Sequence, residues 1–174
     1  MSSKVPFFHC KLEHSGLYDH DVMQVTIVFN RGLDSPKTDV KEFSNTMEQI
    51  YGKTRQFLML YDASRLKSVK PDHIKLLKAA IDDNSDLAET LTIAIAAVMP
   101  NIALAPVIQK LFHFGERSKR SVVDVKLCTS LQEAENFLVE KKNMFLKHGN
   151  DEDATKQNNP SEKTELLETK VESV

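Results

Sequence analysis

The chain is short of the residues that build several common kinds of site. Of its 174 residues, five are glycine, two are cysteine and none is tryptophan. So few glycines make a phosphate-binding loop hard to build, and neither a Walker A motif nor GxGxxG occurs. GxSxG and HExxH, which mark common serine hydrolases and zinc peptidases, are also missing. We therefore expect that the protein is not an enzyme and has no cofactor.

The two cysteines, Cys10 and Cys128, form no CxxC pair and lie far apart in the sequence. This favours two reduced thiols in a cytoplasmic protein, and it leaves a disulfide between them open. Histidines 9, 14 and 20 surround Cys10 together with several carboxylates. Because they fall in a strand and a turn rather than on one helix, a polar hairpin explains them better than a metal does. We predict no metal site.

Long hydrophobic runs are missing as well. The longest, near residues 91–99, is about half of the roughly 20 residues that a membrane-spanning helix needs. The first residues contain no continuous apolar segment of the kind that a secretory signal has. We therefore expect no transmembrane segment and a cytoplasmic location.

Charge is distributed unevenly along the chain. Residues 150–174 carry seven acids and three lysines, a net charge of −4 within a total of −2, so residues 1–149 carry +2. A body so near neutrality does not favour nucleic acid, which needs a concentrated basic face. The acidic segment has too few apolar residues to offset the entropy of ordering it. We predict a domain at 1–149 and a disordered acidic tail at 150–174.

Within the domain, apolar strands alternate with amphipathic helices. This alternation predicts an α/β fold, with a five-stranded, mostly parallel sheet, an antiparallel first strand at its edge and four helices. Both faces of strand 22–29 are largely apolar, which predicts that both are covered. Ser130 and Glu133 have the spacing of a capping box. The expected strands are 6–13, 22–29, 57–63, 90–99 and 122–128, and the expected helices are 37–52, 71–82, 102–114 and about 130–146.

Candidate site residues follow from this arrangement, because ligands of open α/β sheets bind beyond the carboxyl ends of the strands. A loop held together by its own hydrogen bonds is the alternative explanation for them. A small basic loop precedes the last strand and could contact phosphate or an acidic partner, although three cations on a loop are usually only solvated. The candidates at the strand ends are Asp62, Ser64, Arg65, Ser68, Asp72 and Asn101, and those of the basic loop are Arg117, Lys119 and Arg120.

Two short segments carry a resemblance to a known family. The strand end Leu60-Tyr61-Asp62 and the helix start at 130–134 (SLQEA), followed by Phe137-Leu138, resemble the STAS/SpoIIAA-like superfamily over about residues 7–147. The resemblance implies a single SpoIIAA-like domain with a non-catalytic role in regulation or protein interaction. The best-known members are anti-sigma-factor antagonists that are phosphorylated on a serine at the start of the second helix. Residues 69–73 (VKPDH) contain no serine, so we do not transfer that phosphosite to this chain.

The strand at 57–63 and the segment that ends at Pro100 are also similar to CRAL-TRIO (Sec14-like) domains. That resemblance implies an alternative function, the binding of a lipid or another apolar small molecule. The favoured hypothesis is a protein partner of unknown identity, and a homodimer is left open. The pocket of the lipid alternative would use Leu104, Val107, Ile108, Leu111 and Phe112.

Overall fold

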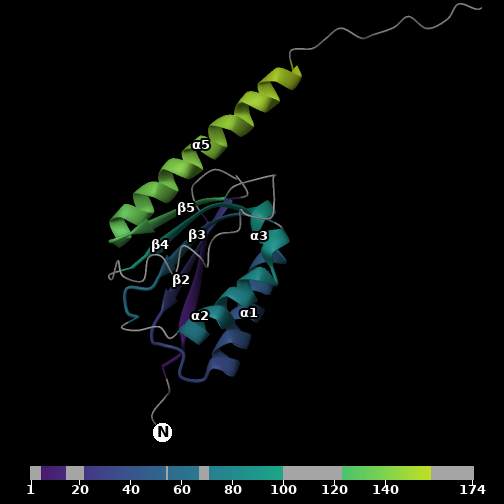
Figure 1. Cartoon of the computed structure of the whole chain (residues 1–174). Coiled ribbons are helices and arrows are strands. Elements are labelled where there is room, and N and C mark those ends of the chain that lie inside the picture. Colours follow the sequence, from purple (N-terminus) through teal and green to yellow (C-terminus); the bar gives the residue numbers. More distant parts are fainter. Residues whose placement is uncertain (1–4, 15–21, 54, 67–70, 100–122, 158–174) are drawn as a thin grey trace, which may run out of the picture.

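A computed structural model describes residues 5–14, 22–53, 55–66, 71–99 and 123–157 of the chain. This part contains five strands and four helices, in a βαβ-type succession after an initial pair of strands (Figure 1). They are β1 (Phe8–His14), β2 (Val22–Phe29), α1 (Pro36–Tyr51), β3 (Gln56–Asp62), α2 (Pro71–Asp82), α3 (Ser85–Leu91), β4 (Thr92–Val98), β5 (Asp124–Cys128) and α5 (Leu131–Gln157).

The strands form one sheet in the order β1-β2-β3-β4-β5. β1 pairs antiparallel with β2, with Phe8 opposite Phe29, and the other neighbours pair in parallel. The predicted α/β class, with a mostly parallel sheet and an antiparallel edge strand, is therefore confirmed. Strands β2 to β5 all end at the same side of the sheet, which we call the carboxyl edge.

Helices α1, α2 and α3 cover one face of the sheet (Figure 1). Helix α1 is amphipathic, as predicted, and its apolar stripe is buried, since Phe43, Met47 and Ile50 are at most 2% exposed. They belong to the same buried cluster as Val25 and Ile27 of β2, which are fully buried. This cluster is the larger of the two cores, and it fixes α1 directly after the end of β2.

Helix α5 covers the other face, lying over β3, β4 and β5 (Figure 1). Its Ala134 and Leu138 are buried with Leu58 and Leu60 of β3. The alanines of β4, Ala94 and Ala96, belong to the same cluster and are fully buried. Small side chains on β4 let a helix approach the sheet closely.

The prediction that strand 22–29 is covered on both faces is confirmed in part. On the face that points away from α1, Val22 is buried with the α5 core, whereas Gln24, Thr26 and Val28 are half-buried. One helix is about 10 Å wide and strands lie about 4.8 Å apart, so α5 can cover only two or three of the five strands. On the same face of β1, the side chains of His9, Lys11 and Glu13 are exposed.

Two ion pairs join α5 to the edge strand β5. Nζ of Lys126 lies 3.2 Å from Glu133, and Nζ of Lys141 lies 2.6 Å from Asp124. Both ammonium groups also lie 5.7 Å from the centre of the Phe137 ring, where a cation is attracted to the ring face. These charged side chains therefore hold α5 against β5. Of the three strands under α5, β5 has the least apolar face toward the helix.

The start of α5 matches the predicted capping box in part. The Ser130 Oγ accepts a hydrogen bond from the Glu133 N–H at 3.2 Å. The reciprocal bond runs to a different residue, because Glu133 Oε2 accepts from the N–H of Thr129 at 3.0 Å. That bond is the main cause that lowers the pKa of Glu133, and Lys126 lowers it further.

The sequence did not predict α3, and the expected strand 90–99 begins two residues late, at Thr92. The predicted helix 71–82 ends at Asp82 as expected, and α3 begins at Ser85 directly after it. Asn84, between the two helices, is buried and forms a hydrogen bond with each of them. Its Nδ2 donates to the carbonyl of Ala80 in α2, and its own carbonyl accepts from the N–H of Ala88 in α3.

Helix α5 crosses the predicted border between domain and tail. It continues through Gly149 to Gln157, the first residues of the segment 150–174 for which we predict disorder. A glycine inside a helix costs only about 1 kcal/mol relative to alanine, which does not by itself end a helix. Residues 158–174 and the predicted helix 102–114 lie outside the described residues.

Candidate functional site

The loop that follows β3 lies at the carboxyl edge and begins with a buried carboxylate. Asp62 is the last residue of β3, pairs in register with Val28 and Val98, and is 6% exposed. Its Oδ1 accepts a hydrogen bond from the N–H of Ser64 at 2.9 Å. This is the contact of an Asx turn, in which aspartate replaces a backbone acceptor. Asp62 therefore shapes the loop, and the residues after it are the ones displayed.

Ser64 and Arg65 are both exposed on this loop. Nη1 of Arg65 donates to Oδ1 of Asn30 at 3.2 Å, and Nδ2 of Asn30 donates to the carbonyl of Pro6 at 3.3 Å. The structure thus brings together the predicted residues Asp62, Ser64 and Arg65. It also joins them to Asn30 at the end of β2, which the sequence analysis did not single out.

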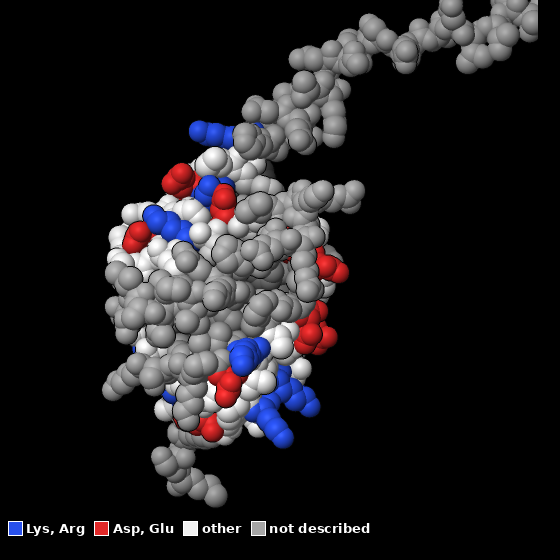
Figure 2. Space-filling view, in the orientation of Figure 1, with Lys and Arg blue, Asp and Glu red and all other residues white. Residues whose placement is uncertain are grey.

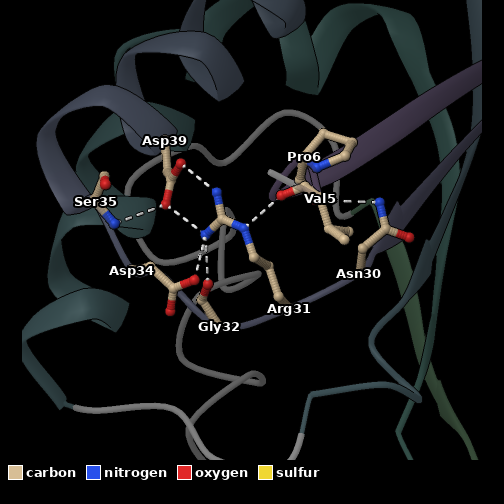
Figure 3. Close-up of polar contacts among 8 residues, drawn as sticks. All are labelled: Val5, Pro6, Asn30, Arg31, Gly32, Asp34, Ser35 and Asp39. Carbon is tan, nitrogen blue, oxygen red and sulfur yellow. Dashed lines mark hydrogen bonds and ion pairs between the residues drawn. The ribbon is translucent and has the colours of Figure 1, made fainter. Parts of the chain in front are cut away.

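Next to Asn30, Arg31 forms a buried ion pair at the same edge (Figure 3). Its Nη1 and Nη2 each donate to one carboxylate oxygen of Asp39 at 2.9 Å, and its Nε donates to the carbonyl of Val5 at 2.8 Å. The hydrogen bond to Asp39 is the main cause that raises the pKa of Arg31. Asp34 lies 3.3 Å away but is 61% exposed. Arg31 therefore ties the segment before β1 to the start of α1.

The sequence contains a signal for this pair. Asp39 lies four residues before Phe43, on the buried stripe of α1, and is itself 4% exposed. A carboxylate on an apolar stripe needs a cationic partner, because an unpaired buried charge is strongly unfavourable. Arg31, in the short connection before the helix, was the nearest cation on its amino-terminal side apart from Lys37.

Asp72 is the second residue of α2, with a side chain that is 90% exposed and lies 3.7 Å from Nζ of Lys75. It faces solvent, whereas Asp62 is enclosed. The remaining candidates and the proposed lipid pocket lie outside the described residues: Ser68, Asn101, Arg117, Lys119, Arg120, Leu104, Val107, Ile108, Leu111 and Phe112.

The described residues offer little for metal or thiol chemistry. They contain no group of three or more His, Cys, Asp or Glu side chains placed to hold a metal ion. Cys10 is half-buried and Cys128 is buried, and burial raises the pKa of both thiols. A thiol with a raised pKa stays protonated at neutral pH and reacts slowly.

Neither the surface charge nor the hydropathy of the described residues indicates a particular kind of partner. On the face that Figure 2 shows, the described acidic and basic side chains are interspersed rather than gathered into a patch of one sign. Among the helices described here, none combines the length and the apolar character that crossing a bilayer requires. Among the described residues, the loop at 62–65 is therefore the best-defined candidate site.

No protein-family model matches the chain, and no curated protein matches it. Solved structures do. An uncharacterized protein of the DUF3478 family from Shewanella loihica PV-4, which has a SpoIIAA-like fold, is 12% identical, with 79% of this chain and 98% of that chain covered and a TM-score of 0.55. The unphosphorylated anti-sigma factor antagonist SpoIIAA is 15% identical, covering 75% of this chain and 97% of its own, with a TM-score of 0.43.

The first of these similarities shows that the chain has a SpoIIAA-like fold, as the sequence predicted. At such low identity the likeness extends to the fold alone. The same fold can carry different functions, so the residues of the site, and not the fold, indicate what the chain does.

Proposed function

We propose that the chain is a non-catalytic, STAS-like regulatory domain that works by binding another protein. Its binding surface is the loop 62–65 together with the exposed start of α2. The supporting observation is the contrast within this loop: Asp62 is buried and fixed, while Ser64 and Arg65, directly after it, are exposed.

Loops held on a rigid scaffold are common binding elements, because their exposed side chains are already ordered before the partner arrives. Two contacts provide that order here. Asp62 fixes the backbone of Ser64, and Asn30 orients the guanidinium of Arg65. Arginine is enriched in protein interfaces, where its planar group makes several directed hydrogen bonds. Arg65 is therefore the residue to which we assign most of the specificity.

A catalytic role receives less support from the same geometry. A general base needs a free acceptor within hydrogen-bonding reach of the proton that it removes. Asp62 is the enclosed carboxylate of the loop, and its Oδ1 is occupied by the N–H of Ser64. The arrangement stabilises a loop conformation, which is what a recognition surface requires.

The test is a quantitative affinity purification with full-length protein. Arg65→Glu should lose at least one partner that the wild-type chain retains. Lys53→Glu is the matched control, because it makes the same charge change at an exposed site just after the far end of α1. Lys53→Glu should retain that partner. If Arg65→Glu and Lys53→Glu retain the same partners in equal amounts, this loop is not the binding surface.

A further inference from the structure

Strand β1 is at the end of the strand order, so only one of its two sides pairs with β2. Among the described residues, no strand pairs with the other side, which we call the open side. The N–H of Asn30 donates to the carbonyl of Phe7 at 2.9 Å, next to the first pair of the β1–β2 register. In an antiparallel pair, residues that bond to the neighbouring strand alternate with residues whose backbone groups point away from it. The N–H and C=O groups that point to the open side are therefore those of residues 8, 10, 12 and 14.

Three consecutive residues of β1 have exposed side chains. Leu12 is 39% exposed and lies on the face of the sheet that α1 covers. Lys11 and Glu13 lie on the other face, where 65% and 46% of their side chains are exposed, and the Lys11 ammonium contacts the Glu13 carboxylate. His9 is exposed on that face too. The strand thus presents unpaired backbone groups, which are a template for another strand, together with one apolar side chain and two opposite charges.

A second β1 that runs antiparallel along the open side of the first has one register in which the charges match. When Leu12 lies opposite Leu12 of the second copy, Lys11 lies opposite Glu13 of that copy, and the reverse contact forms by symmetry. Each lysine then has a carboxylate on either side, so the contact within each strand is kept. The backbone allows neighbouring registers only in steps of two residues, and these place Lys11 opposite Lys11 or Glu13 opposite Glu13. Like charges directly opposite each other are unfavourable, so one register is selected.

We propose that two copies of this chain associate through their β1 strands, which run antiparallel with Leu12 opposite Leu12. Such a contact is two-fold symmetric, the commonest arrangement of homodimers, and it joins the two sheets into one. Backbone hydrogen bonds and the burial of Leu12 supply the attraction, while Lys11 and Glu13 select the register. The proposal does not rest on the proposed function, because the loop 62–65 follows the central strand β3 and β1 is at the end of the strand order.

The experiment measures the molar mass of the full-length protein by light scattering over a range of concentrations. Wild-type protein should change from monomer to dimer as concentration rises. Lys11→Glu and Glu13→Lys should each raise the dimer dissociation constant at least about tenfold, because each turns both opposite-charge contacts into like-charge ones. An equal mixture of these two variants should dimerise about as tightly as the wild type, because one chain then supplies two carboxylates and the other two ammonium groups. Loss of the contact within one chain cannot produce this recovery.

Lys53→Glu is the matched control, because it makes the same charge change at an exposed site after α1. It should dimerise like the wild type. Circular dichroism checks that all variants remain folded. A wild-type chain that stays monomeric up to millimolar concentration would overturn the proposal, and so would a mixture of Lys11→Glu and Glu13→Lys that shows no recovery.

A second pair of variants tests the backbone contact separately. Leu12→Pro removes an N–H that points to the open side, and it leaves the hydrogen bonds between β1 and β2 in place. We expect it to raise the dimer dissociation constant at least about tenfold. Leu12→Val keeps the N–H and an apolar side chain, so it should dimerise like the wild type. A dimer that Leu12→Pro leaves unchanged would show that the two copies meet elsewhere.

Discussion

Arg31 and Asp39 are joined by two parallel hydrogen bonds of 2.9 Å each, one to each carboxylate oxygen. Their side chains are 17% and 5% exposed, so the pair is largely removed from water. Because Arg31 follows β2 and Asp39 lies in the first turn of α1, the pair fixes the connection at the carboxyl edge. The same connection contains Asn30, which orients Arg65.

Removing one member of this pair should destabilise the fold. Asp39→Ala leaves Arg31 largely buried without its counter-charge, and we expect the free energy of unfolding to fall by about 2–4 kcal/mol. Asp34→Ala is the matched control, because Asp34 also contacts Arg31 but is 61% exposed, and its loss should stay below about 1 kcal/mol. Urea denaturation measures both values. Equal losses for the two variants would show that burial of the pair is unimportant.

The role of Asp62 can be separated from its charge. Asp62→Asn retains a side-chain oxygen that can accept the hydrogen bond from the N–H of Ser64, whereas Asp62→Ala does not. We expect the amide of Ser64 to keep its protection from hydrogen exchange in Asp62→Asn. In Asp62→Ala it should exchange about five- to tenfold faster, since a hydrogen bond contributes about 1 kcal/mol. If both variants lose protection equally, the carboxylate charge matters more than the turn.

Glu133 should make the stability of the protein depend on pH in the acidic range. Its pKa is lowered from 4.5, first by the N–H of Thr129 and then by Lys126. The contribution of the ionised carboxylate is therefore complete above its unfolded pKa of 4.5, and it is lost as the pH falls through the lower folded value. The difference in unfolding free energy between wild type and Glu133→Gln should be constant at neutral pH and shrink below pH 4.5. Urea denaturation across this range measures it, and a difference that stays constant down to strongly acidic pH would contradict the assignment.

The sequence was sufficient to predict the fold class, because the signals for its strands and helices are local and agree with one another. The strands are apolar runs, the stripe of Phe43, Met47 and Ile50 has helical spacing, and alternation of the two element types leaves few topologies. The hydrogen-bond partner of Asp62 could not be predicted from the sequence in the same way. Whether a carboxylate at a strand end turns inward to Ser64 or outward to a ligand depends on a contact of 2.9 Å that no pattern encodes.

Three features needed the structure for other physical reasons. The partial burial of Gln24, Thr26 and Val28 depends on how many strands one helix can cover, which is a property of the assembled sheet. Helix α3 depends on Asn84, which bonds to the helix before it and the helix after it. The ion pair of Arg31 and Asp39 could have been suspected from the stripe, but its geometry depends on the path of the connecting loop.

The direction of α5 bears on how the protein can be immobilised for binding measurements. The helix starts at the carboxyl edge, beside the end of β5, and leaves the sheet at the other edge (Figure 1). The loop 62–65 follows β3 at the carboxyl edge, so the part of α5 after Lys141 runs away from it. A chain attached to a surface through that part of the helix would therefore leave Ser64 and Arg65 accessible to a partner.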